Sequence, residues 1–209
     1  MSRPGRLVVV TGSGTEVGKT WWTAALASAL QARGVGAAAR KPVQSYAPDD
    51  DTTDADVLAA ATGADAHTVC PPARWLPRAM APPIAAAALG RPAFTIADLV
   101  GEIIWPESCP LGFVEGAGGV RSPLADDGDT VSLVRALAPD VVLVVTHAGL
   151  GVIHAVRSAR DALVDAPVVV ALNHYDRHDE VHRANHDWLV VRDAFDVVTA
   201  PGELADRWA

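Results

Sequence analysis

The sequence is short of cysteine and of long apolar runs, and each shortage excludes a class of protein. Its two cysteines, Cys70 and Cys109, have neither the number nor the spacing of a disulfide framework or a zinc site. We expect both to be reduced and structural, because free cysteine behaves mostly as a small buried hydrophobe. The apolar run at residues 7–10 is too short for a signal peptide or a membrane span, and no later run is long enough. These features predict a cytoplasmic protein with no membrane partner.

Basic residues are also in the minority. The chain carries 17 lysines and arginines against 25 aspartates and glutamates, for a formal net charge of −8. An acidic protein has no general electrostatic reason to bind nucleic acid, so any phosphate binding must come from a local site. Only 5% of the residues are aromatic whereas 50% are hydrophobic, which predicts a core built largely from Ala, Val and Leu. The length of 209 residues suits one α/β domain spanning residues 1–209.

Apolar runs and helical stretches alternate along the chain. Residues 7–10 read as a strand buried on both faces, and a glycine-rich segment and a helix over residues 19–33 follow, with Gly34 as the expected C-cap. Residues 70–92 carry many prolines and are predicted to be irregular apart from an Ala-rich turn at residues 84–89. Further strands are predicted at residues 36–40, 111–114, 141–146, 168–172 and 197–198, and further helices at residues 54–61, 131–138, 153–163 and 180–192. This alternation predicts a doubly wound, mostly parallel sheet with helices on both faces, like that of P-loop NTPases.

The strongest chemical signal is a glycine-rich loop between the first strand and the first helix. It reads Gly12-Ser13-Gly14-Thr15-Glu16-Val17-Gly18-Lys19-Thr20 and resembles a Walker A loop. Glycines let backbone N–H groups turn inward around phosphate oxygens, and the helix N-terminus adds its dipole. Lys19 is expected to reach the β- and γ-phosphates, and the Thr20 hydroxyl to ligate Mg²⁺. The spacing departs from the usual form, because five residues rather than four separate Gly12 from Gly18.

Polar residues follow the predicted strands at the edge where doubly wound sheets bind ligands. Glu115 ends a buried strand and precedes a glycine-rich turn, so its carboxylate is placed to meet a metal near the phosphates. Lys41 ends another strand and is held by Pro42, which predicts a fixed cation in the same crevice. The residues expected together at this edge are Thr11, Lys41, Glu115, Thr146 and Asn173.

These motifs together resemble the dethiobiotin synthetase family. The resemblance covers residues 7 to about 175 and rests on the glycine-rich loop, Lys41-Pro42-Val43-Gln44-Ser45, Asp56, Ala81-Pro82-Pro83-Ile84-Ala85, Val114-Glu115-Gly116-Ala117-Gly118-Gly119, Leu150-Gly151-Val152-Ile153 and Asn173. It implies a homodimeric ligase that makes dethiobiotin from 7,8-diaminopelargonate and CO₂ with ATP and Mg²⁺.

The resemblance also implies site residues. ATP would be held by Gly14, Thr15, Glu16, Val17, Gly18, Lys19, Thr20 and Glu115, with Asn173 at the adenine, and Mg²⁺ by Thr20, Asp56 and Glu115. The catalytic group would comprise Lys41, Lys19, Thr15 and Glu16. The substrate would be bound by Ser45, Gly118, Leu150, Gly151 and His154, with its carboxylate tail near the helix that begins around residue 149.

Several alternatives stay open. Asp54 is close enough to Asp56 in sequence to be the metal ligand instead. A second hypothesis is a partition-type regulatory ATPase, although the loop has Thr15 and Glu16 where that class usually carries a second lysine. A third is a divergent family member acting on another amine, because the family often has Asn at the position of His154 and a small residue at that of Tyr46. The series His174, His178, His182 and His186 is interpreted as a solvated polar face rather than a metal site.

Overall fold

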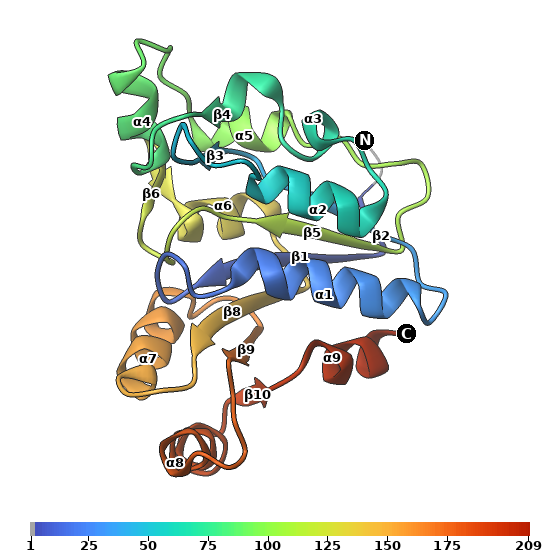
Figure 1. Cartoon of the computed structure of the whole chain (residues 1–209), viewed down its shortest axis with the longest axis vertical. Coiled ribbons are helices and arrows are strands. Elements are labelled where there is room, and N and C mark those ends of the chain that lie inside the picture. Colours follow the sequence, from blue (N-terminus) through green and yellow to red (C-terminus); the bar gives the residue numbers. More distant parts are fainter. Residues whose placement is uncertain (1–2) are drawn as a thin grey trace.

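A six-stranded parallel sheet forms the centre of the molecule. The structure is a computed structural model that describes residues 3–209. All neighbouring strands of the sheet pair in parallel, in the order β10-β9-β8-β1-β5-β2, so that β1 lies between β8 and β5 (Figure 1). The strands are β1 (Arg6–Gly12), β2 (Ala37–Arg40), β5 (Leu111–Glu115), β8 (Val141–His147), β9 (Val168–Asn173) and β10 (Asp196–Val198). The predicted α/β fold with a mostly parallel sheet is confirmed.

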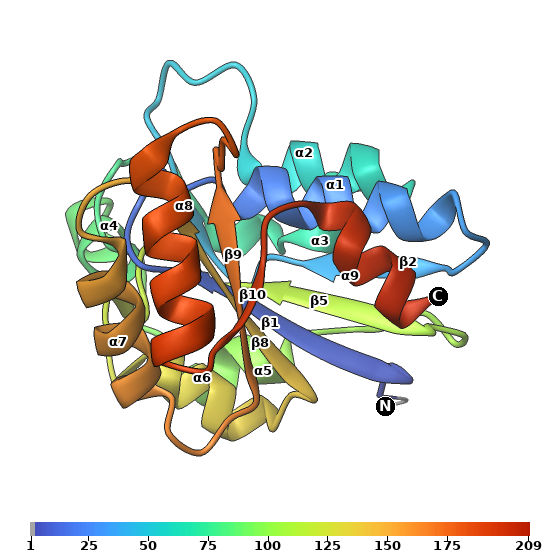
Figure 2. The same cartoon turned by 90° about the horizontal axis from the view of Figure 1, so that it is seen from below.

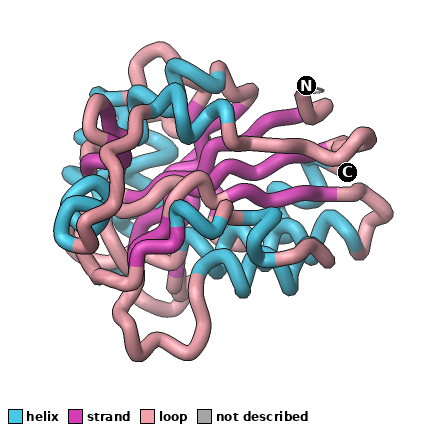
Figure 3. The backbone as a smooth tube through the Cα atoms, turned by 90° about the horizontal axis from the view of Figure 1, so that it is seen from above, coloured by secondary structure: helices cyan, strands magenta, loops and turns pink. Residues whose placement is uncertain are grey.

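Helices cover both faces of this sheet (Figures 2 and 3). One face packs against α1, α2, α3 and α9, and the other against α4, α5, α6 and α7. A smaller cluster at the β10 end joins α7 to Leu189, which lies in a short π-helix (Trp188–Arg192) that continues α8. The helices are α1 (Lys19–Gln31), α2 (Asp54–Thr62), α3 (Ala66–Val69), α4 (Pro82–Ala88), α5 (Ile96–Gly101), α6 (Thr130–Leu137), α7 (Val152–Ala162), α8 (Glu180–Asp187) and α9 (Pro201–Trp208).

The first strand shows why the sequence encodes a two-sided core. Successive side chains of a strand point to opposite faces, so a strand covered on both sides must be apolar at every position. Leu7 and Val9 join the core beneath α5 and α6, whereas Val8 and Val10 join the core beneath α1 and α2. The unbroken apolar run therefore matches a strand covered on both faces, and its pairing with β8 and β5 places the loop that follows it within one edge of the sheet.

Several local predictions differ from the structure. The helix expected over residues 180–192 is α8 followed by the π-helix, and α1 ends at Gln31, so Gly34 follows its C-cap rather than forming it. Within residues 70–92, expected to be irregular apart from an Ala-rich turn, that turn belongs to the helix α4, and a strand, β4 (Trp75–Leu76), pairs with β3 (Gln44–Ser45). A small hairpin of β6 (Pro123–Ala125) and β7 (Gly128–Asp129) follows the glycine turn after β5. No helix within residues 3–209 is long and apolar enough to cross a membrane.

Candidate active site

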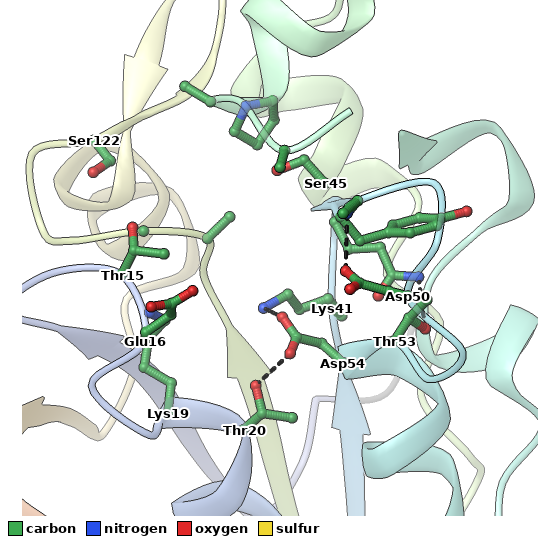
Figure 4. A pocket seen from close by; sticks show the side chains of 18 of the residues that line it. Thr15, Glu16, Lys19, Thr20, Lys41, Ser45, Asp50, Thr53, Asp54 and Ser122 are labelled. Carbon is green, nitrogen blue, oxygen red and sulfur yellow. Dashed lines mark hydrogen bonds and ion pairs between the residues drawn. The ribbon is translucent and has the colours of Figure 1, made fainter. Parts of the chain in front are cut away.

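A cleft of about 770 Å³ opens at the carboxyl ends of β1, β2 and β5 (Figure 4). Its walls come from the loop after β1, the start of α1, the segment from β2 to α2, the start of α4 and the turn after β5. Its lining includes Thr15, Glu16, Gly18, Lys19, Thr20, Lys41, Ser45, Tyr46, Asp50, Asp54, Met80, Pro82, Gly118 and Ser122. Segments about 100 residues apart in sequence therefore meet at the edge predicted for ligand binding.

The loop between β1 and α1 has the geometry of an anion cradle. Gly18 is the N-cap of α1, has φ of 92°, and offers no side-chain cap, so the first N–H groups of α1 remain open to a ligand. A Cβ at Gly18 would lie 2.1 Å from Asn173 Nδ2, so the position requires glycine for space as well as for backbone conformation. Glu16 also has a positive φ, 59°, which shows how tightly the loop turns before the helix.

Lys19 and Asn173 both contact this loop. Lys19 Nζ donates a 3.0 Å hydrogen bond to the carbonyl oxygen of Gly14, and Asn173 Nδ2 donates one of 3.0 Å to that of Val17. Burial, and then the positive charge of Lys41, hold the pKa of Lys19 below its usual value. Lys19 therefore sits as a partly desolvated cation directly beneath the cradle.

Lys41 is the centre of a buried polar cluster. Its ammonium lies 2.6 Å from Asp54 Oδ2 and 2.7 Å from Glu115 Oε1, and it donates a third bond of 3.2 Å to the carbonyl oxygen of Gly116. The side chains of Lys41 and Glu115 are 2% and 0% exposed, whereas that of Asp54 is 43% exposed. Burial alone would lower the Lys41 pKa, but the two carboxylates outweigh it and raise that pKa above its ordinary value. The Lys41 charge in turn lowers the pKa of Asp54.

Oxygen atoms of three residues meet beside Lys19 in a set that suits Mg²⁺. Thr20 Oγ1 lies 2.8 Å from both Asp54 Oδ1 and Glu115 Oε1. Neighbouring ligands of an octahedral Mg²⁺ with bonds of about 2.1 Å stand about 3 Å apart, so each of these two spacings matches a pair of adjacent ligands. The Thr20 hydroxyl has a single proton and can donate to only one carboxylate at a time, so the cluster is rich in acceptors. The chemistry and the spacing of these oxygens fit a hard divalent cation.

The structure places Asp56, predicted as a metal ligand, at the N-terminal cap of α2 rather than in the cleft. Asp56 Oδ2 accepts hydrogen bonds from the backbone N–H and the hydroxyl of Thr53, which closes a capping box at the start of α2. Asp56 does not line the cleft, whereas Asp54, two residues earlier, faces Thr20 and Lys41. The physical reason is that the carboxylate of Asp56 is occupied in capping the N-terminus of α2.

Thr23 was missed by sequence reasoning and holds Glu115 from behind. Its hydroxyl lies 2.9 Å from both Glu115 Oε2 and the carbonyl oxygen of Lys19, one turn earlier on α1, and its single proton can be donated to only one of them at a time. A spacing of four residues after Lys19 was the available signal, because side chains at i and i+4 share a helix face. Gln44 was missed as a support as well, and it bonds Thr53 and the backbone N–H of Ala55, which fixes the start of α2.

The other predicted residues divide into two groups. Thr15, Glu16, Ser45 and Gly118 line the cleft, on the walls that face Lys41. Figure 4 shows Thr15, Glu16 and Ser122 on one side of the cleft and Ser45 on another, with Lys41 reaching between them. The second group lies outside: Leu150, Gly151 and His154 surround the start of α7 and do not line this cleft, and Leu150 is 92% exposed.

The chain contains only two lysines, Lys19 and Lys41, and both lie in this cleft. The remaining 15 basic side chains among its 17 are arginines. The histidine series forms no comparable centre. His178 precedes α8 rather than lying on it, and the part of the chain that the structure describes holds no group of three or more His, Cys, Asp or Glu side chains arranged to bind a metal.

A phosphate cradle after the central strand, with a lysine opening the next helix and an acidic residue ending a neighbouring strand, defines a P-loop nucleotide-binding protein. A family model described as an AAA domain matches residues 6–189. Among solved structures, chloroplast FtsY from Physcomitrella patens superposes with a TM-score of 0.55 at 17% identity, over 94% of this chain and 58% of that one. At that identity the likeness concerns the fold alone.

Curated relatives define the family within this class. An ATP-dependent dethiobiotin synthetase from Haloferax mediterranei is 36% identical over 92% of this chain and 82% of its own length. Another from Corynebacterium efficiens is 39% identical over 76% of this chain and 72% of its own. The chain belongs to the ATP-dependent dethiobiotin synthetase family, as the motifs predicted.

Proposed function

We propose that the protein is an ATP-dependent cyclo-ligase that forms dethiobiotin from 7,8-diaminopelargonate and CO₂, in biotin biosynthesis. One observation carries the proposal beyond family membership: both lysines of the chain converge on a phosphate cradle and a pair of carboxylates. A ligase that activates a carbamate with ATP needs cations at both the phosphates and the carbamate. This cleft offers one lysine for each.

The reaction has three steps. One amine of the substrate adds to CO₂ and loses a proton, which gives a carbamate. A carbamate oxygen attacks the γ-phosphorus of ATP, so that a carbamic–phosphoric anhydride forms and ADP leaves. The second amine then attacks the carbonyl carbon, closes the ureido ring and expels phosphate.

The residues of the cleft would act by position and charge. Lys19 and the open N–H groups at the start of α1 would hold the phosphates, and Lys41 would offset the charge of the attacking carbamate. Thr15, Glu16, Ser45 and Gly118, which line the same space, would orient the diamine and its carbamate. Holding the reacting groups at contact distance lowers the activation barrier, because the entropy cost of bringing them together is met when the substrates bind.

Thr20, Asp54 and Glu115 would hold the magnesium ion, and Asn173, beside the loop, would contact the base. Bound there, Mg²⁺ would supply positive charge next to the β- and γ-phosphates. Thr23 would keep Glu115 in place through its hydrogen bond to the second carboxylate oxygen.

We also propose a homodimer in which the start of α7 from one copy completes the cleft of the other. Leu150, Gly151 and His154 do not reach their own cleft, and a helix N-terminus suits the carboxylate tail of the substrate. Sedimentation should then give twice the 21.8 kDa chain mass. His154→Ala should raise KM for the diamine more than it lowers kcat.

The direct test is phosphate release by the purified protein with ATP, Mg²⁺ and bicarbonate, with and without 7,8-diaminopelargonate, followed by product mass. Release that depends on the diamine, together with a product of dethiobiotin's mass, supports the proposal, and Lys41→Ala should abolish both. If phosphate release ignores the diamine, the partition-type ATPase is favoured. If another amine is cyclised instead, the divergent-ligase alternative is favoured.

A further inference from the structure

The Lys41 ammonium and a divalent cation would use the same carboxylates. Lys41 Nζ contacts Asp54 Oδ2, Glu115 Oε1 and the Gly116 carbonyl, so its three N–H donors are all engaged. Asp54 and Glu115 are also the two acidic residues that face Thr20 Oγ1. One atom, Glu115 Oε1, serves both sets, at 2.7 Å from the ammonium and 2.8 Å from the Thr20 hydroxyl.

Two cations on one carboxylate oxygen repel each other, and more strongly in a site withdrawn from water. Glu115 has little room to move, because its side chain is fully buried and its other oxygen lies 2.9 Å from the Thr23 hydroxyl. Lys41 has a flexible four-carbon stem. Its partner Asp54 lies on the open side of the cleft, where the side chain is 43% exposed. The lysine is therefore the partner that can yield.

We propose that Lys41 and the divalent cation compete for the carboxylates of Asp54 and Glu115. Loading of the metal–nucleotide complex then turns the ammonium away from Asp54 and into the part of the cleft lined by Ser45 and Thr15. The inference rests on the proposed function, because it takes a nucleotide, a divalent cation and a carbamate at this site. It adds that one side chain links the loading of ATP to the handling of the carbamate, since each ligand shifts the position of Lys41.

Metal affinity without nucleotide gives the first test. Mn²⁺ would be titrated into the full chain, and free Mn²⁺ followed by its electron paramagnetic resonance signal. Lys41→Met should bind Mn²⁺ roughly tenfold more tightly than the wild type, because the competing cation is gone. Arg40→Met is the matched control: Arg40 is buried on the preceding position, but its hydrogen bonds go to the carbonyls of Ala39 and Ile104. Its Mn²⁺ affinity should stay within about twofold of the wild type, as expected for a charge that shares no oxygen with the metal.

A second test uses the wild type and does not depend on the folding of a variant. Lysine labelled with ¹³C at Cε gives two side-chain signals, because the chain has two lysines, and Lys41→Arg assigns them. ADP in excess chelator should move the Lys19 signal. Addition of Mg²⁺ to that complex should then move the Lys41 signal, as its ammonium leaves Asp54.

Equal or weaker Mn²⁺ binding by Lys41→Met, or a Lys41 signal that ignores Mg²⁺ in the ADP complex, would overturn the inference. Neither experiment contains the diamine or detects dethiobiotin. A protein that passes both tests and makes no dethiobiotin would refute the proposed reaction and leave the competition intact. Dethiobiotin formation by a protein whose Lys41 signal ignores Mg²⁺ would support the proposed reaction and refute the competition.

Discussion

The ammonium of Lys41 and the carboxylate of Glu115 form an ion pair at 2.7 Å from which solvent is almost completely excluded. The two residues are 74 positions apart: Lys41 directly follows β2, and Glu115 ends the neighbouring parallel strand β5. Removing one member of a buried pair leaves an uncompensated charge. Substitution of either residue should therefore destabilise the fold as well as alter the cleft.

Glu115→Gln should therefore lower the free energy of unfolding by about 3 kcal/mol, the lower end for a broken buried pair because Lys41 keeps Asp54. Urea denaturation at pH 7 measures the change. The double variant Lys41→Met/Glu115→Gln should be less destabilised than the sum of the two single variants. Strict additivity would mean that the pair is not coupled.

Asp54 and Asp56 offer a matched pair of substitutions. Asp54→Asn should reduce diamine-dependent turnover by roughly a hundredfold and weaken its dependence on Mg²⁺, because a metal ligand and a contact of Lys41 are altered together. Asp56→Asn should instead cost about 1 kcal/mol of stability through the weakened cap of α2, with turnover little changed. Mg²⁺ titrations of activity and urea midpoints separate the two effects. If Asp56→Asn lost Mg²⁺-dependent turnover and Asp54→Asn did not, Asp56 would be the metal ligand.

The pKa shifts predict how stability depends on pH. Asp54 has a folded-state pKa below its ordinary 3.8, so its contribution is present above about pH 4 and is lost as the pH falls through the folded value. Lys41 has a folded-state pKa above 10.5, so its contribution is present below that pH and is lost only as the pH rises through the raised value. Urea midpoints should fall steeply in acid for the wild type and less steeply for Asp54→Asn. An unchanged acid slope in Asp54→Asn would exclude Asp54 as the group responsible.

Gly18→Ala should abolish nucleotide binding. The new methyl group would lie 2.1 Å from Asn173 Nδ2 on a backbone with φ of 92°, so both Asn173 and the loop must shift. Gly101→Ala is the control, because Gly101 lies outside the cleft and a Cβ there would meet nothing within 4 Å. Calorimetric titration with ADP should show loss of binding in the first variant and near-normal binding in the second.

The order of strands and helices could be predicted from the sequence because apolar runs and helical stretches alternate cleanly. The identity of the acidic residue near Thr20 could not. Thr53 and Asp56 stand three residues apart, which is the spacing of a capping box, and that pattern was the available sign that Asp56 is occupied. Asp54 meets Thr20 only because Gln44 and Thr53 fix where α2 begins, and such tertiary contacts leave no periodic trace.

Burial of both lysines has a consequence for the chemistry of the surface. Apart from the two lysines and the histidines, every basic side chain is an arginine. Acylating and carbamoylating reagents modify guanidinium groups poorly. Reactive acyl donors that spare this surface can inactivate the protein through its side-chain amines only by entering the cleft, so protection by ATP against such reagents would report directly on occupancy of the phosphate cradle.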